Sequence, residues 1–504
     1  MTQNKIISLD EMATIALELK QAEKIVLCHG TFDLLHIGHI KHLQRAREEG
    51  DKLFVTVTSD QFINKGPGRP VFNENLRAES LAAIECVDYV AINHAETSVP
   101  VIEAVKPDCY VKGGDYKNQA DDVTGNISVE HRMVEKFGGR IFFTDELTSS
   151  STRLLNEYFD VFSPETYTYL HQFKEQHHAE SLIANLKDLH GLNVLVLGEA
   201  IVDEYHYTSP LGQTGKGNVL SVKYEDREQF AGGAVAIANH IAGFVDNVTI
   251  LTGLGELNSH EKFIRSKLLD NVTAEFFMLK DRPTIVKRRY VDGDISKLFE
   301  VYFYNEADIP KDVDERITAW LDENLPRYDV VMVADFGNGF ISDAMVNTLS
   351  KGAKFLAVNA QTNSGNRGYH FITRYPRADF VSLNEPELRL STLDKQRPID
   401  ELAKEIVVKL NAQNVAVTRG TRGAMIVSKE DCHEIPALSS KVVDRVGAGD
   451  SFLALSGLCL AGGLPAETAL IIGSAAAALD VQIVCNREPV KANILFKYLQ
   501  TLLK

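Results

Sequence analysis

The chain has 504 residues, which is too long for one hydrophobic core, so we expect two or three domains. Of these residues 44% are hydrophobic and 24% charged, a composition typical of a folded globular protein. Its 69 acidic residues outnumber 53 basic ones, and no dense basic stripe offsets the net charge of −16, which argues against nucleic-acid binding. No signal peptide and no apolar run long enough to span a membrane is apparent, so we expect a cytoplasmic protein without a membrane partner.

The first 156 residues alternate short apolar runs with segments of helical character. Strands are expected at 24–30, 52–60, 87–93 and 107–115, and helices at 39–50, 75–85 and 129–139. This alternation predicts an α/β domain in which helices cover both faces of a parallel sheet.

A polar segment of helical character, residues 157–188, follows and predicts a linker. Beyond it, strands are expected within 192–205, 247–256, 328–337, 353–360, 378–385, 414–420 and 423–428. Two further stretches, roughly 205–230 and 283–305, show strand alternation without an intervening helix and predict a small antiparallel lid. We therefore expect a domain at 1–156, the linker at 157–188 and a second α/β domain at 189–504.

Three histidines, His36, His39 and His42, lie in the stretch GTFDLLHIGHIKHL. A zinc site would need a fourth ligand, and no Cys or Glu lies beside them. A continuous helix through the first two is disfavoured by Gly38 between them. The third interpretation is a strand, a glycine turn and a helix that begins near Gly38, whose free backbone N–H groups would bind phosphate.

The stretch GTFDLLHIGH resembles the HxGH motif of the nucleotidylyltransferase superfamily, in its cytidylyltransferase-like branch, and so implies a Rossmann-like domain. The segment VKGGDY at 111–116 is similar to the bifunctional ADP-heptose synthesis enzymes, and TSSSTRLL at 148–155 resembles the superfamily's Ser/Thr-rich signature. The implied reaction is attack of a sugar or polyol phosphate on a nucleoside triphosphate, with Mg²⁺ and release of pyrophosphate. The base stays open, because the first motif points to CTP and the second to ATP.

The resemblance implies that His36, His39 and Lys65 act in catalysis by stabilising or neutralising phosphate. It implies nucleotide and phosphate contacts at Gly30, Thr31, Phe32, Arg77, Ser151 and Thr152. From the residues alone, Lys65 could also be a solvated loop lysine, and Arg77 a surface helix residue. His42 is interpreted as a helix residue outside the chemistry.

Near the C-terminus, VDRVGAGDSF places two glycines before a helix start, where backbone N–H groups can approach an anion. This string resembles the DTxGAGD signature of the ribokinase (PfkB) family and implies a doubly wound ribokinase-like domain with a small β lid. The resemblance implies that Asp450 accepts the proton of the acceptor hydroxyl. It also implies that Gly447, Ala448 and Gly449 hold the transferring phosphoryl group.

Further motifs of that family follow in the expected order. They imply sugar contacts at Asp203, Tyr205, Gly232, Gly233 and Asn239, an Mg²⁺ site at Asn384 and Glu387, and a nucleotide loop at Thr418, Gly420 and Gly423. Three departures leave the sugar open: Arg445 replaces a threonine, and AVNAQTNSG and GQTGKGNVL replace segments typical of heptose kinases.

Together the motifs favour a bifunctional enzyme of nucleotide-sugar synthesis, with the module order of the heptose enzymes reversed. ATP would phosphorylate a heptose-like sugar or sugar phosphate, and nucleotidylyl transfer would give an ADP- or CDP-sugar. One alternative is a cytidylyltransferase for a polyol phosphate fused to a polyol kinase. Another is a nucleotide-sensing protein with one inactive module. Because ribokinase-like lids often pair between subunits, the resemblance also suggests a homodimer.

Overall fold

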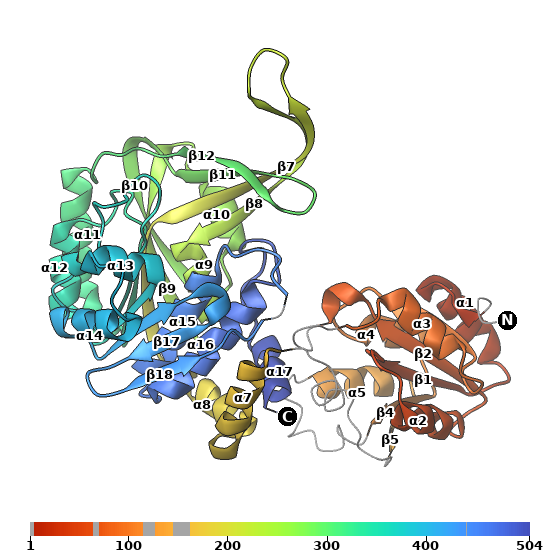
Figure 1. Ribbon diagram of the computed structural model, residues 1–504. Helices are drawn as coiled ribbons and strands as arrows, with labels where there is room; N and C mark the ends of the chain where they lie inside the picture. The colour runs from red at the N-terminus through yellow and green to blue at the C-terminus, as the bar shows by residue number, and fades with distance from the viewer. Residues whose placement is uncertain (1–4, 64–69, 114–125, 145–161, 440, 504) are drawn as a thin grey trace. The chain divides into compact units, whose positions relative to one another are not determined.

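The computed structural model describes residues 5–63, 70–113, 126–144, 162–439 and 441–503 (Figure 1). It divides into two compact units: unit 1 comprises Met1–Ser163 with Phe496–Lys504, and unit 2 comprises Pro164–Leu495. Both units are α/β structures, as the sequence predicts. No helix within the described ranges is long and apolar enough to cross a membrane.

Unit 1 contains a parallel five-stranded sheet in the order β3-β2-β1-β4-β5. The strands are β1 Ile25–Gly30, β2 Lys52–Thr58, β3 Tyr89–Asn93, β4 Cys109–Gly113 and β5 Arg140–Thr144. The helices are α1 Leu9–Leu19, α2 Ile37–Arg47, α3 Glu74–Ala82, α4 Val99–Val105 and α5 Asn126–Lys136, with a short 3-10 turn, η2, at Asp60–Phe62. The sequence pattern missed β5, α1 and α4.

Alternate residues of β1 enter two separate cores, as the two-residue period of a strand requires. Val26 and Cys28 pack with Leu43 of α2 on one face. Ile25 and Leu27 pack on the other face, in a core to which α1 and α4 contribute. The chain reverses its direction of winding between β1 and β4, the kind of point where open α/β sheets bind ligands.

Unit 2 contains a nine-stranded sheet in the order β10-β9-β6-β13-β14-β15-β16-β17-β18, parallel except for the last two strands. These are β6 Asn193–Gly198, β9 Asn247–Leu257, β10 Val272–Pro283, β13 Val330–Asp335, β14 Leu356–Ala360, β15 Phe380–Asn384, β16 Asn414–Thr418, β17 Ala424–Val427 and β18 Cys432–Ile435. One face packs on α11, α12 and α14, and the other on α9 and α15 (Figure 1).

The helices that follow residue 163, the last of which extends into the C-terminal part of unit 1, vary from four-turn helices to single 3-10 turns. They are α7 Pro164–Gln176, α8 Ala179–Asp188, η5 Leu189–Gly191, α9 Ala234–Ala242, α10 Glu261–Lys267, α11 Lys311–Asn324, η6 Leu325–Arg327, α12 Asp343–Gly352, η7 Ile372–Arg374, α13 Glu385–Thr392, α14 Ile399–Lys409, η8 Gly420–Arg422, α15 Ala448–Ala461, α16 Ala466–Asp480 and α17 Ala492–Leu502. Helices α7 and α8 fall in the polar stretch predicted to be helical.

A separate four-stranded sheet, β12-β11-β7-β8, forms the lid of unit 2, and its β7–β8 hairpin projects from the body (Figure 1). Its strands are β7 Ala200–Gln213, β8 Leu220–Gly233, β11 Ile285–Val291 and β12 Lys297–Phe303. The prediction of a purely antiparallel lid is wrong, because the central strands β7 and β11 pair in parallel. A parallel pair requires a long crossover connection, which the body of the domain supplies between them.

Candidate functional site

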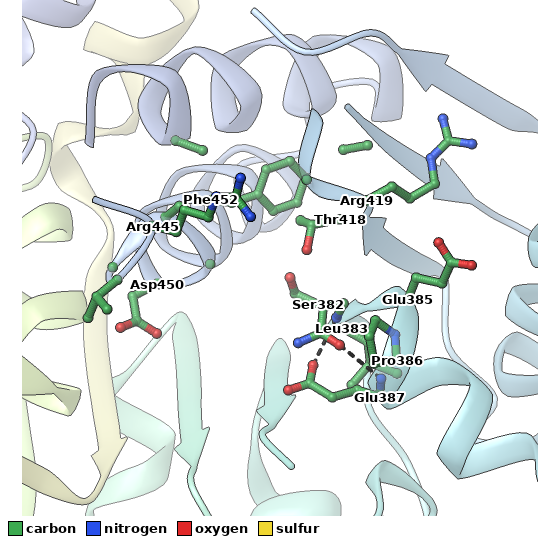
Figure 2. Close-up of a pocket in the computed structure, with 18 of the residues that line it drawn as sticks. Ser382, Leu383, Glu385, Pro386, Glu387, Thr418, Arg419, Arg445, Asp450 and Phe452 are labelled. Carbon is green, nitrogen blue, oxygen red and sulfur yellow. Dashed lines mark hydrogen bonds between the residues drawn. The ribbon is translucent and has the colours of Figure 1, made fainter. Parts of the chain in front are cut away.

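A cavity of about 1180 Å³ lies in unit 2, at the carboxyl ends of β14, β15 and β16. The lid strands β7 and β11 and the start of α15 complete its wall. Figure 2 shows Asp450 and Glu387 on two walls of the cavity, with both carboxylates turned toward the space between them. Because open α/β sheets bind ligands at this edge, we take the cavity as the candidate site of unit 2.

The predicted phosphate-binding segment, 447–449, opens helix α15 at the cavity wall. Gly447 is the N-cap and has a φ of 103°, and a Cβ there would clash with Asn486 Oδ1 and Asp480 Oδ2. By contrast, a Cβ on Gly449 would meet nothing within 4 Å. The first turn therefore presents backbone N–H groups to open space at the positive end of the helix dipole, which favours a bound phosphate.

Asp450 lies in the first turn of α15 and lines the cavity. Burial, with Asp203 nearby, raises the pKa of Asp450 to about 7, and the ammonium of Lys287 partly opposes this increase. A carboxyl whose pKa lies near the working pH can accept a proton and release it again within one catalytic cycle. The position of Asp450 beside the phosphate-binding turn thus suits a general base.

Asn384 and Glu387 form a reciprocal cap at the start of α13. The Glu387 backbone N–H donates to Asn384 Oδ1 at 2.9 Å, and the Asn384 backbone N–H donates to Glu387 Oε2 at 2.8 Å. Glu387 Oε1 accepts from the backbone N–H of Thr362 at 3.2 Å. Burial raises the pKa of Glu387 to about 7. The cap holds a buried carboxylate rigidly at the cavity wall, with one lone pair of each oxygen left for a further ligand.

The predicted nucleotide loop follows β16 along the same wall. Thr418, Gly420 and Gly423 all line the cavity. Gly420 and Gly423 have φ values of 60° and 81°, and a Cβ on Gly423 would clash with the Ile435 carbonyl oxygen. Both glycines are therefore required by the backbone of the turn η8, whatever ligand the turn contacts.

Two predicted sugar contacts, Asp203 and Gly233, line the cavity at the base of the lid. Asp203 is buried and accepts a short hydrogen bond from Arg289 Nη1. Gly232 does not line the cavity, but a Cβ at this position would clash with Asp203 Oδ2. Gly232 thus leaves room for the Asp203 carboxylate at the cavity wall.

The other two predicted sugar contacts lie away from the cavity lining. Tyr205 is fully buried, and its hydroxyl donates to Asp444 Oδ2 at 2.5 Å. Asn239 donates to the Lys267 carbonyl at 2.8 Å and accepts from the Leu269 backbone N–H at 3.2 Å. Both side chains therefore satisfy protein groups rather than face the cavity.

Lys287 and Arg289 of β11 line the cavity and were missed by the sequence motifs. Lys287 pairs in register with Asp203 across the parallel β7–β11 ladder, and both side chains are buried. Burial lowers the pKa of Lys287 despite the neighbouring Asp203. The strand VKRRY, residues 286–290, contained a signal for them. Residues two apart in a strand share a face, so Lys287 and Arg289 could have been predicted to face the same side of the lid.

In unit 1, His36 and His39 organise the start of α2. His36 Nδ1 accepts from the Gly38 backbone N–H at 3.1 Å, and His39 Nδ1 accepts from the His36 backbone N–H at 3.4 Å. The ring centroids lie 4.1 Å apart. Since His36 Nδ1 accepts a hydrogen bond and burial lowers the pKa of the ring, the proton resides on Nε2. The helix start therefore carries an imidazole N–H donor beside its backbone donors.

Arg77 is buried in unit 1. Its guanidinium donates to the carbonyls of Thr31, Thr58 and Phe72, at 2.6, 2.7 and 2.9 Å, and to Asp60 Oδ1 at 2.6 Å. These bonds form a clamp that joins the loop after β1 to the end of β2. The clamp fixes Thr31, one of the predicted phosphate contacts.

Phe32 is also buried, with a φ of 48°, and packs into the core beneath α2 and α3. A Cβ on Gly30 would approach its ring to 3.1 Å, so Gly30 makes room for the turn. Lys65, Ser151 and Thr152 lie outside the described residues. His42 bonds Thr144 Oγ1 at 2.8 Å through Nδ1, and no cluster of three or more metal-ligating side chains occurs in the described ranges.

Comparison with known proteins separates the same two parts of the chain. Residues 192–490 match the pfkB family carbohydrate kinases, and residues 27–157 match the cytidylyltransferase-like family. The chain shares 39% identity over 151 residues with the bifunctional protein HldE of Syntrophotalea carbinolica and 41% over 159 residues with that of Citrifermentans bemidjiense. These alignments cover 29% and 31% of this chain and the same shares of the relatives.

The chain therefore spans about three tenths of the length of the curated relatives it matches. A putative ribokinase from Agrobacterium tumefaciens has a similar fold, with a TM-score of 0.50 and 18% identity over 60% of this chain and 96% of that structure. The pfkB match covers more than half of the chain and contains the cavity, the lid and the GAGD turn. The chain thus belongs to the pfkB family of carbohydrate kinases and carries a cytidylyltransferase-like domain on the N-terminal side.

Proposed function

We propose that unit 2 transfers the γ-phosphoryl group of ATP to a hydroxyl of a sugar or sugar phosphate. The observation that carries this proposal is the placement of Asp450, with its pKa near 7, in the first turn of the helix whose N–H groups face the cavity. Asp450 accepts the proton of the acceptor hydroxyl as its oxygen bonds to the γ-phosphorus and ADP leaves. The N–H groups of 447–449 stabilise the charge on the moving phosphoryl group.

Mg²⁺ fits the residues near the start of α13. The buried carboxylate of Glu387 keeps one lone pair on each oxygen, and Asn384 fixes its orientation. Since few protein carboxylates converge there, the ion would keep waters and phosphate oxygens as ligands, as Mg²⁺ commonly does. When bound, it would neutralise charge on the ATP phosphates.

For unit 1, we propose nucleotidylyl transfer to a sugar phosphate with release of pyrophosphate. Support comes from His36 Nε2–H and the N-terminus of α2, which together offer donors to a phosphate. His39 acts beside it, while Lys65, Ser151 and Thr152 stay sequence-based proposals. ATP and CTP both remain donors to be tested.

Joined in one chain, the two activities make a bifunctional enzyme of nucleotide-sugar synthesis that yields an ADP- or CDP-sugar. The similarity to bifunctional HldE proteins supports a heptose-like acceptor. Because ATP is the phosphate donor, we place the enzyme in the cytoplasm. Lid pairing between subunits would make it a homodimer.

The test is a screen of purified protein with Mg²⁺, ATP or CTP, and a panel of sugars, sugar phosphates and polyol phosphates. ADP and pyrophosphate release are measured, and products are identified by mass. We expect ADP release with one sugar class and pyrophosphate release with a related phosphate. A polyol phosphate as the sole acceptor would contradict the nucleotide-sugar proposal, and the absence of both releases would contradict the enzymatic one.

A further inference from the structure

The cavity wall of unit 2 carries more positive charge than its carboxylates neutralise. Several of its cations are paired, such as Arg289 with Asp203 and Arg422 with Glu385. Within the described part of the chain, four cavity cations have no ion-pair partner: Lys287, Arg367, Lys395 and Arg445. An unpaired cation at a cavity wall is available to an anionic ligand.

Arg445 is the unpaired cation nearest in sequence to the phosphate-binding turn. It stands two residues before Gly447, and its side chain is exposed at the cavity. Figure 2 shows Arg445 and Asp450 on the same side of the cavity, with the guanidinium of Arg445 beside Phe452 and the Asp450 carboxylate turned into the open space. Arg445 thus precedes the phosphate-binding turn and Asp450 follows it, and both residues line the cavity.

The base of the Arg445 side chain is held firmly. The preceding residue, Asp444, accepts from the Val446 backbone N–H at 3.2 Å and from the Cys485 backbone N–H at 3.1 Å. It also accepts from the Tyr205 hydroxyl and lies 3.3 Å from Lys297 Nζ. These contacts fix the backbone from which the Arg445 side chain extends, so that its Cα keeps one position relative to the phosphate-binding turn.

We propose that Arg445 is a catalytic arginine that contacts the γ-phosphoryl group during transfer, an inference that rests on the proposed kinase activity of unit 2. As the acceptor oxygen bonds to phosphorus, its proton passes to Asp450 and the bond from phosphorus to the β–γ bridging oxygen breaks. Arg445 donates to the oxygens on which charge is then concentrated. A planar guanidinium can donate two parallel hydrogen bonds to a phosphoryl group, which a threonine cannot.

Charge balance at the cavity supports the same role. Asp203, Glu387 and Asp450 are all acidic, and the pKa values of the last two are raised to about 7 by burial. ATP adds further negative charge among them. A fixed cation beside the transferred group reduces this repulsion most where charge develops, as arginine does in other phosphoryl-transfer enzymes.

The test compares Arg445→Thr and Arg445→Lys with the wild type and with Arg397→Thr. Arg397 is a matched control because it is a surface arginine, paired with Glu405, that does not line the cavity. We expect Arg445→Thr to lower kcat for ADP release about a hundredfold, with a smaller change in KM for ATP. Arg445→Lys should recover part of kcat, and Arg397→Thr should match the wild type. Unchanged kcat, or an increase in KM alone, would overturn the proposal.

A second measurement keeps this inference separate from the kinase proposal. Calorimetric binding of ADP with Mg²⁺ is compared with and without aluminium fluoride, which mimics the phosphoryl group in transfer. We expect aluminium fluoride to tighten ADP binding to the wild type, and to do so much less for Arg445→Thr, while binding of ADP alone is similar in both. If aluminium fluoride tightens ADP binding in this way but no acceptor is phosphorylated, the kinase proposal is refuted and the phosphate contact of Arg445 is not. Equal tightening in both proteins would refute the role of Arg445.

Discussion

The hydroxyl of Tyr205, on lid strand β7, donates to Asp444 Oδ2 at 2.5 Å, and so joins the lid to the segment that precedes the phosphate-binding turn. On the lid side, the guanidinium of Arg289 lies 5.6 Å from the Tyr205 ring centroid and binds Asp203. On the other side, Asp444 fixes the Val446 backbone N–H. The position of the lid and the geometry of the phosphate-binding turn are thus connected through Asp444, which binds Tyr205 of β7 and Lys297 of β12.

Tyr205→Phe removes that hydrogen bond and keeps the ring. Because Asp444 is buried, loss of a donor to it should destabilise the domain by about 2 kcal/mol. We expect kcat for ADP release to fall while KM for the sugar stays near the wild-type value, and urea unfolding to show the loss of stability. A large increase in sugar KM with unchanged stability would indicate that Tyr205 contacts the sugar, as the sequence motif implies.

The rate of phosphorylation should depend on the protonation of Asp450. Its raised pKa, about 7, means that the base is available above this pH and is lost as pH falls through it. We expect kcat, measured at saturating Mg²⁺ to keep Glu387 ionised, to decrease about tenfold for each pH unit below the pKa. If kcat does not change between pH 5 and 8, and the chemical step is shown to be rate-limiting, Asp450 is not the general base.

Glu387→Gln keeps the shape of the side chain but removes the carboxylate proposed to hold Mg²⁺. The cap on α13 survives in part, because the amide oxygen can still accept from one backbone N–H. We expect the Mg²⁺ concentration that gives half-maximal ADP release to rise at least tenfold, and excess Mg²⁺ to restore much of the rate. If the Mg²⁺ concentration for half-maximal ADP release does not change, Glu387 does not bind the ion.

Arg77 should matter for the stability of unit 1 rather than for nucleotide contact. Arg77→Ala leaves Asp60 and three carbonyl oxygens without a buried donor, which should cost about 3 kcal/mol or more. Arg77→Lys retains the charge but cannot reach four acceptors, so we expect it also to unfold at a lower temperature. Direct binding of the nucleotide by Arg77 predicts the opposite: normal unfolding with an increased KM for the nucleoside triphosphate.

Features that a short stretch of chain determines were predictable from sequence. The buried parallel strands read as continuous apolar runs, and Gly447 of the phosphate-binding turn lies where the backbone requires a glycine. The fold class and the two modules followed from these patterns. The strand β5 was missed because only its last residue, Thr144, is buried and because it begins directly after Gly138 and Gly139.

Features that depend on tertiary packing were not predictable in the same way. Asp203 and Tyr205 lie on the same face of β7, but only the first reaches the cavity, because the second meets Asp444. Arg77 looks like a surface helix residue until the loop after β1 is packed against it. Lys287 and Arg289 belong to no motif, since their role depends on the pairing of β11 with β7.

The central claim, two independent catalytic sites in one chain, is tested most directly by Asp450→Asn and His39→Ala assayed side by side. Each protein is given ATP with the free sugar, and separately a nucleoside triphosphate with the sugar phosphate. We predict that Asp450→Asn loses ADP release by at least a thousandfold and keeps pyrophosphate release, while His39→Ala shows the reverse. Loss of both activities in either variant, with unchanged thermal unfolding, would contradict independent sites, and retention of both in either variant would contradict the assigned chemistry.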